Sequence, residues 1–269
     1  MTVSPPVCAV VLAGPRAEPL AASLTALGHQ RRPPAETVVV AVGEPVDDGG
    51  SAHRSLYLAA GAGTAGAFHL GVRAACETGA DWIWLLDGLA LPDPYALEEL
   101  LEGAARGGGS GQCVLVAGRI VTPDRSTHPA ALPWPVLLDK QAALSAAGHG
   151  LVAVRAARHG SLLVRRSAIK AEGLPRSGYR AGGDDLEWTS RLLRTGPGFL
   201  APGSVAVRRL GESDRPGGGA ARPWRSFGNA LDLLARGPFS LQERLWFGYG
   251  LARPGGSGRR PSRSPRATT

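Results

Sequence analysis

The sequence contains few cysteines, and their positions argue against cross-links. Its three cysteines, Cys8, Cys76 and Cys113, are odd in number and lack metal-ligand spacing, so we expect small buried side chains in a reducing compartment. The six histidines show no paired spacing on a helix, which gives no indication of a zinc site. The composition therefore predicts a fold stabilised by an apolar core and not by disulfides or structural metal.

The sequence also lacks a long apolar run of the kind that spans a membrane. Its longest uncharged stretch, residues 55–72, contains His69 and four glycines, and its centre has the composition of a turn. The opening residues have no basic segment before their apolar run, unlike a signal peptide. We therefore expect a cytoplasmic protein.

Acidic side chains are fewer than basic ones, but the excess charge is unevenly placed. The formal net charge is +8, and residues 253–269 hold five arginines and no acid, so the rest of the chain carries only +3. Such a mildly basic folded part does not favour nucleic acid as a partner. The tail itself is expected to be disordered.

Short apolar runs alternate with helical patterns, which is typical of an α/β fold with a mainly parallel sheet flanked by helices. Strands are expected at residues 7–14, 37–43, 55–59, 82–88, 114–121 and 204–210, a strand leading into a short helix at 160–169, and helices at 65–78, 95–106 and 184–196. The glycine-rich residues 103–112 predict a mobile connection, and residues 122–158 show no clear element. A length of 269 residues suits one domain at 1–211, a helical extension at 212–252 and the tail at 253–269.

Two acidic sites lie where ligands collect in such sheets, beyond the carboxyl ends of the strands. Asp87 directly follows the apolar run WIWLL and could hold a divalent cation or a ribose hydroxyl, or merely open the turn that follows. Asp184, Asp185 and Glu187 begin a helix, where they could act chemically or simply cap it. The segment GAGTAG, which ends at Gly66, lacks the lysine and hydroxyl of a P-loop and favours a tight turn.

Several segments, in order, resemble the family 2 inverting glycosyltransferases of GT-A fold, in their rhamnosyl- and galactofuranosyltransferase-like branch. The similarity spans residues 7–237. It includes the opening strand, the segment QRRPP, the glycine-rich turn, the acidic end of the strand WIWLLD, and the acidic helix DDLEW. It ends with PWRSFGNALDLLARG, which resembles the start of the family's C-terminal helix.

This resemblance implies transfer of a sugar from a nucleoside diphosphate donor to an acceptor hydroxyl, with inversion. Asp185 would accept the hydroxyl proton, and Asp184 and Glu187 would orient it or the acceptor. Asp87 would bind the donor's ribose or a metal ion, either Mg²⁺ or Mn²⁺, next to Gly66 of the glycine-rich turn. The acceptor would be a cell-envelope glycan, a glycolipid or a secondary metabolite.

The donor side departs from the family pattern. Asp87 is followed by Gly88 and Leu89 where the family usually has further acids, and Arg208 and Arg209 stand where a late metal-binding histidine is common. One interpretation is that an arginine supplies the charge of the missing ion, since a guanidinium suits diphosphate oxygens. The other is a degenerate homologue that serves as a noncatalytic binding or partner subunit.

Aromatic side chains gather near the end of the sequence, in the segments 224–236 and 241–251. They could pack on the domain or form a homodimer contact. Alternatively, with the arginine tail, they could attach the protein to an anionic membrane that carries lipid-linked acceptors.

Overall fold

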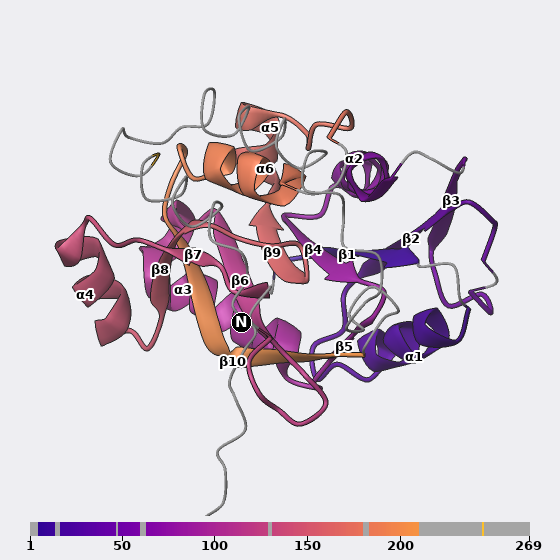
Figure 1. The fold of residues 1–269 in the computed structure, drawn as a ribbon, viewed down its shortest axis with the longest axis horizontal. Coiled ribbons are helices and arrows are strands. Elements are labelled where there is room, and N and C mark those ends of the chain that lie inside the picture. The colour runs from indigo at the N-terminus through magenta and orange to yellow at the C-terminus, as the bar shows by residue number, and fades with distance from the viewer. Residues whose placement is uncertain are drawn as a thin grey trace, which may run out of the picture.

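A mixed sheet with helices on both faces forms the core of the protein (Figure 1). The computed structural model describes residues 5–13, 17–46, 48–59, 63–128, 131–179 and 183–209, and Arg244. The strands of this part are β1 (Val7–Ala13), β2 (Glu36–Val42), β3 (Arg54–Leu58), β4 (Trp82–Asp87), β5 (Ala90–Pro92), β6 (Leu115–Val121), β7 (Trp134–Pro135), β8 (Val152–Ala156), β9 (Ser161–Arg165) and β10 (Gly198–Arg208). The helices are α1 (Ala17–Gly28), α2 (Gly63–Glu77), α3 (Ala96–Gln112), α4 (Lys140–Gly148), α5 (Arg166–Glu172) and α6 (Asp184–Leu192).

The strands lie in the order β3-β2-β1-β4-β9-β6-β10-β8-β7, and β5 pairs with β10. Strands β3, β2, β1 and β4 are parallel to one another, as are β6 and β10, but β9 enters antiparallel between β4 and β6. The predicted α/β architecture is therefore confirmed, although the sheet is mixed and not strictly parallel.

Alternate side chains of the central strands face two separate apolar layers. In β1, Val7, Ala9 and Val11 pack in the layer that includes residues of α1 and α3, whereas Cys8 and Val10 pack in the layer with α2, α5 and α6. Such burial on both faces explains the nearly continuous apolar runs of the central strands.

The cysteines confirm the expectation of buried apolar side chains. Cys8 and Cys113 are fully buried and Cys76 is partly buried, all as free thiols. Burial raises the pKa of Cys8 to about 12 and that of Cys113 to about 11, which keeps both thiols protonated. These two residues therefore contribute packing and not nucleophilic chemistry.

Two sequence-based expectations were wrong in the middle of the chain. Residues 122–158, expected to lack regular structure, contain β7, α4 and β8. The glycine-rich segment 103–112, expected to be a mobile connection, continues α3 to Gln112. The helix persists because the glycines let it lie close to the sheet: a Cβ on Gly107 would lie 2.4 Å from Phe199 Cε2.

The proposed boundaries beyond residue 209 lie outside the described part of the chain, apart from Arg244. This holds for the helical extension 212–252, the tail 253–269 and the predicted end of the last strand at residue 210. No helix among the described residues combines the length and apolar character that crossing a bilayer requires.

The close approach of α3 to β10 predicts the effect of one added methyl group. Gly107→Ala should lower the free energy of unfolding by about 1–3 kcal/mol, because the new Cβ meets the Phe199 ring and Leu151. Gly148→Ala is the matched control, since nothing lies within 4 Å of its Cβ position, and it should leave stability unchanged or raise it by up to ~1 kcal/mol. Urea unfolding of both variants tests this, and equal stabilities would contradict the packing.

Candidate active site

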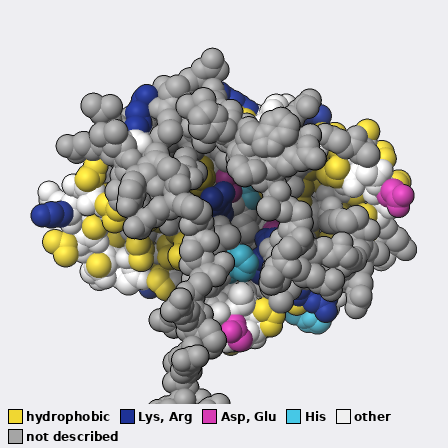
Figure 2. Space-filling model, viewed as in Figure 1, with side chains coloured by type: hydrophobic (Ala, Val, Ile, Leu, Met, Phe, Trp, Pro, Cys, Tyr) yellow, Lys and Arg dark blue, Asp and Glu magenta, His cyan; other side chains and the backbone are white. Residues whose placement is uncertain are grey.

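A cavity of about 330 Å³ lies beyond the carboxyl ends of β1, β4, β6 and β10. Charged and histidine side chains lie close together near the middle of the face that Figure 2 shows. The cavity wall includes three acids, two arginines and two histidines, namely Asp87, Asp184, Asp185, Arg158, Arg208, His128 and His159. The structure thus brings Asp87 and the acid pair, which are about a hundred positions apart in the sequence, into one cleft.

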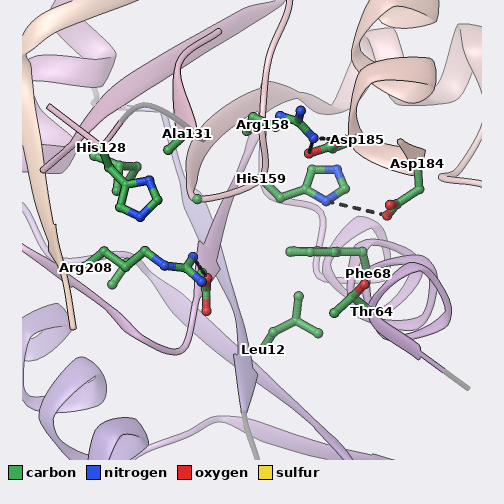
Figure 3. Close-up of a pocket in the computed structure, with 14 residues that line it drawn as sticks. Leu12, Thr64, Phe68, His128, Ala131, Arg158, His159, Asp184, Asp185 and Arg208 are labelled. Carbon is green, nitrogen blue, oxygen red and sulfur yellow. Dashed lines mark hydrogen bonds and ion pairs between the residues drawn. The ribbon is translucent and has the colours of Figure 1, made fainter. Parts of the chain in front are cut away.

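On one side of the cleft, Asp87 and Arg208 form an ion pair (Figure 3). Asp87 is the last residue of β4, and Arg208 is the last residue of β10. The chain turns after Asp87 into β5, where Ala90 pairs with Arg208, so the sheet itself brings the two side chains together. The other carboxylate oxygen of Asp87 accepts a hydrogen bond from the backbone N–H of Leu89 at 3.1 Å, which fixes the orientation of the carboxylate.

The turn after Asp87 has a steric reason for its glycine. A Cβ on Gly88 would lie 2.1 Å from the carbonyl oxygen of Leu12, closer than any side chain can approach. In this turn, a second acid directly after Asp87 would therefore require the backbone to move. This close approach explains the glycine at position 88; it does not explain Leu89, the other position where the family usually has an acid.

On the other side of the cleft, Asp184 and Asp185 begin α6. Thr189, one turn later in this helix, accepts a hydrogen bond from the backbone N–H of Ala157 at 2.9 Å. This bond ties α6 to the turn between β8 and β9, and Arg158 of that turn places Nη1 3.3 and 3.4 Å from the two carboxylate oxygens of Asp185. Asp185 is thereby held as an oriented carboxylate at a helix N-terminus, where negative charge is favoured.

His159 lies beside this acid pair and was missed by the sequence reasoning. Its Nδ1 is 3.9 Å from a carboxylate oxygen of Asp184, and its ring centroid is 3.9 Å from that of Phe68 (Figure 3). The side chain is buried, and its Nε2 has no hydrogen-bond partner among the described residues. One signal in the sequence could have pointed to His159: together with Arg158, it directly precedes the strand predicted to begin at residue 160. The turn that holds these two residues reaches the cleft.

Burial acts in opposite directions on the two members of this pair. Loss of solvent lowers the pKa of His159, against the attraction of the nearby carboxylates of Asp185 and Asp184. Loss of solvent also raises the pKa of Asp184, although His159 partly offsets this. Both groups are therefore shifted toward their neutral forms.

Three other predicted site residues do not line this cavity. Glu187 is buried on α6 but pairs with Arg191 at 3.0 Å and with Arg176 at 3.5 Å, away from the cleft. Gly66 lies on α2 between two residues that do line it, Thr64 and Phe68. Arg209 has an exposed side chain, and its backbone N–H donates to the carbonyl of Leu89 at 2.9 Å.

The residues present do not fit the divalent ion that the resemblance implies. Mg²⁺ at a phosphate site is held by one or two carboxylates together with substrate oxygens, and the described part of the chain has no group of three or more His, Cys, Asp or Glu that could hold an ion by itself. Asp87, the predicted metal ligand, already carries a guanidinium as its cationic partner. We therefore derive no chemical step through a bound metal.

The chain is similar in sequence to a galactofuranosyltransferase, GlfT1 of Mycolicibacterium smegmatis. The two are 31% identical over 215 residues, which cover 74% of this chain and 69% of the relative. The chain belongs to the galactofuranosyltransferase-like GT-A glycosyltransferases. The predicted family resemblance is confirmed, and glycosyl transfer is the reaction class of these enzymes. No protein-family model matches the chain.

Solved structures of low sequence identity confirm the GT-A fold. A mannosyltransferase from Pyrobaculum calidifontis, solved with GDP-Man and Mn²⁺, aligns with a TM-score of 0.56 and 16% identity, over 93% of this chain and 81% of its own. GalNAc-T7, solved with UDP, GalNAc and Mn²⁺, aligns with a TM-score of 0.65 and 12% identity, over 91% and 50%. TarS of S. aureus aligns with a TM-score of 0.58 and 10% identity, over 89% and 41%.

The buried histidine predicts how the stability of this transferase depends on pH. The pKa of His159 is lower in the folded chain than its ordinary value of 6.5, so below that pH the unfolded chain binds a proton that the folded chain does not. His159 should therefore lower the free energy of unfolding as the pH drops below 6.5, by up to about 1.4 kcal/mol per pH unit, whereas the raised pKa of Asp184 acts in the opposite direction.

His159→Gln should flatten this slope, whereas a change at the exposed His149, His149→Gln, should leave it as in the wild type. Urea unfolding at a series of pH values measures the slopes. The burial argument fails if His159→Gln retains the slope of the wild type.

Proposed function

We propose that this chain is an inverting glycosyltransferase of family 2, which moves a sugar from a nucleoside diphosphate to an acceptor hydroxyl in the cleft described above. The observation that carries the proposal is the convergence of Asp87 and Arg208 on one side of the cavity with Asp184 and Asp185 on the other. The family supports glycosyl transfer. Two neighbours of the same fold, solved with GDP-Man and with UDP, support a nucleotide-activated donor.

Asp185 is proposed as the general base on the acceptor side. Its carboxylate takes the proton of the acceptor hydroxyl while that oxygen forms a bond to the anomeric carbon of the donor sugar. The bond from the anomeric carbon to the diphosphate oxygen breaks on the opposite face, and the nucleoside diphosphate leaves with the electron pair. Attack opposite the leaving group inverts the anomeric configuration.

The neighbours of Asp185 support this role. Arg158 contacts both of its carboxylate oxygens, and the backbone N–H of Leu186 donates to one of them at 2.8 Å. These contacts keep the carboxylate oriented before the acceptor arrives. We assign Asp184 a positioning role: its carboxylate lies beside the ring of His159, and this ring in turn contacts the ring of Phe68.

On the donor side, we assign Asp87 to the ribose and Arg208 to the diphosphate. The carboxylate of Asp87 is an acceptor suited to hydroxyl donors, and the guanidinium of Arg208 is a donor suited to phosphate oxygens. Gly66 and Arg209 keep only an indirect role in this proposal, because neither lines the cavity. Glu187 is likewise reassigned from chemistry to holding α6 through Arg191.

The proposed acceptor is a hydroxyl of a cell-envelope glycan, a glycolipid or a secondary metabolite. A galactofuranosyl unit is the first sugar to test, since the relative's name specifies it. Attachment to an anionic membrane and a homodimer contact remain predictions from the aromatic segments 224–236 and 241–251 and from the tail 253–269. Apart from Arg244, those segments lie outside the described residues.

Replacing the proposed base isosterically tests the function. Asp185→Asn keeps the shape of the side chain but cannot accept the proton, so the transfer rate should fall by about 10²- to 10⁴-fold while donor binding persists. Release of nucleoside diphosphate from a panel of UDP- and GDP-activated sugars, including a galactofuranosyl donor, measures the rate with candidate acceptors. NMR of the product's anomeric configuration checks inversion.

Glu102→Gln is the matched control, since this carboxylate is exposed on α3 and does not line the cavity. It should transfer like the wild type. Equal rates for Asp185→Asn and the wild type contradict the assigned base. A wild-type chain that binds donors and transfers none of them to any acceptor instead favours the noncatalytic binding subunit.

A further inference from the structure

The cationic partner of Asp87 in this cleft is part of the chain itself. Arg208 ends β10, a strand held by β6 on one side and by β5 on the other, and its guanidinium contacts the carboxylate of Asp87. Both side chains are more than half buried, with exposed fractions of 22% for Arg208 and 30% for Asp87. The pair is therefore a fixed part of the cavity wall and not a transient surface contact.

We infer that the guanidinium of Arg208 takes the place of a divalent cation in this site, so that the donor diphosphate binds and leaves without a metal ion. The inference rests on the proposed function, because it concerns the donor of that reaction. A donor site without a metal ion would differ from the two neighbours of the same fold that were solved with Mn²⁺.

The distribution of charge in the cleft supports the inference. Each carboxylate in the cleft has a basic neighbour from the chain: Asp87 contacts Arg208, Asp185 contacts Arg158, and Asp184 lies beside His159. A divalent cation at Asp87 would therefore meet one carboxylate whose charge is already balanced, and it would be repelled by the adjacent guanidinium. Mg²⁺ and Mn²⁺ bind through carboxylates that are free to coordinate them.

The turn after Asp87 supports it independently. The Cβ position of Gly88 lies 2.1 Å from a backbone oxygen, so this turn excludes a side chain at position 88, and the next residue, Leu89, is apolar. The strand order meanwhile places a permanent positive charge at the same point, because Arg208 pairs in register with Ala90. The turn thus offers no second carboxylate, and the sheet supplies a cation beside the first.

A guanidinium has the chemistry that this task requires. It has five N–H donors in a planar fork, more than one carboxylate accepts, so Asp87 can orient Arg208 while the same group donates to phosphate oxygens. Its charge is permanent at any physiological pH, and it is already positioned when the leaving group develops negative charge. Arg209 lacks this position, since its side chain is exposed and does not line the cavity.

Isothermal titration of the full chain with UDP, GDP and dTDP, each in EDTA and in Mn²⁺, tests the inference. The wild type should bind its preferred nucleotide with dissociation constants that agree within about twofold in the two conditions. Arg208→Ala should weaken binding in EDTA by about tenfold or more, the loss expected for charge-assisted hydrogen bonds. Mn²⁺ should strengthen nucleotide binding to the Arg208→Ala variant more than nucleotide binding to the wild type. In the variant, the carboxylate of Asp87 has lost Arg208 and is available to the ion.

Two further variants separate this role from general effects on structure. Arg208→Lys keeps the positive charge but loses the planar fork, and should bind the nucleotide more weakly than the wild type and more tightly than Arg208→Ala. Arg125→Ala removes another arginine that pairs with an aspartate, Asp93 at 2.7 Å, outside the cavity. It should bind like the wild type.

The possible results have distinct meanings. Wild-type binding that requires Mn²⁺ overturns the inference and leaves the proposed function intact. Arg208→Ala that binds as tightly as the wild type in EDTA also overturns it, as does an equal response of both proteins to Mn²⁺. A wild type that binds none of the three nucleotides in either condition contradicts the inference and the proposed function together.

Discussion

The ion pair between Asp87 and Arg208 joins the ends of two strands that are 121 positions apart in the sequence, and the cleft is built around it. It can form because the chain turns back after β4 and lays β5 antiparallel to β10. Gly88 permits that turn by letting the backbone pass the carbonyl of Leu12. The same geometry that brings the two charges together therefore also excludes an acidic side chain at position 88.

The opposite side of the cleft depends on a different contact. Thr189 fixes α6 to the backbone of Ala157, and this places Arg158 and His159 next to the two aspartates that begin the helix. Three carboxylates and their basic neighbours then surround one cavity with little net charge. Such a site suits a substrate that carries both hydroxyl groups and a diphosphate, because each side of the cleft offers donors and acceptors already in place.

The sequence alone predicted the parts of the fold that depend on local pattern. Strands β1, β2 and β4 follow from their apolar runs, and α6 follows from its acidic start and its helical period. The sequence also singled out Asp87, Asp185 and Arg208 for the cleft, mainly through their order and spacing in a family resemblance.

The remaining features depend on contacts between distant segments. The glycines at the end of α3 predicted a loop, but here their small size allows the helix to pack against Phe199. Neither the pairing of Glu187 with Arg191 and Arg176 nor the burial of His159 has a sequence pattern that separates it from a catalytic or exposed role. The ion pair of Asp87 was likewise unpredictable as a contact, since it arises from strand pairing and not from spacing.

A crystal structure of the chain with UDP or GDP, grown with Mn²⁺ present, tests the central claim most directly. The account predicts diphosphate oxygens within hydrogen-bond distance of Arg208, in the cavity that Asp185 also lines, and no anomalous peak for manganese at Asp87. A manganese ion between Asp87 and the diphosphate, or a nucleotide bound outside this cavity, would contradict it.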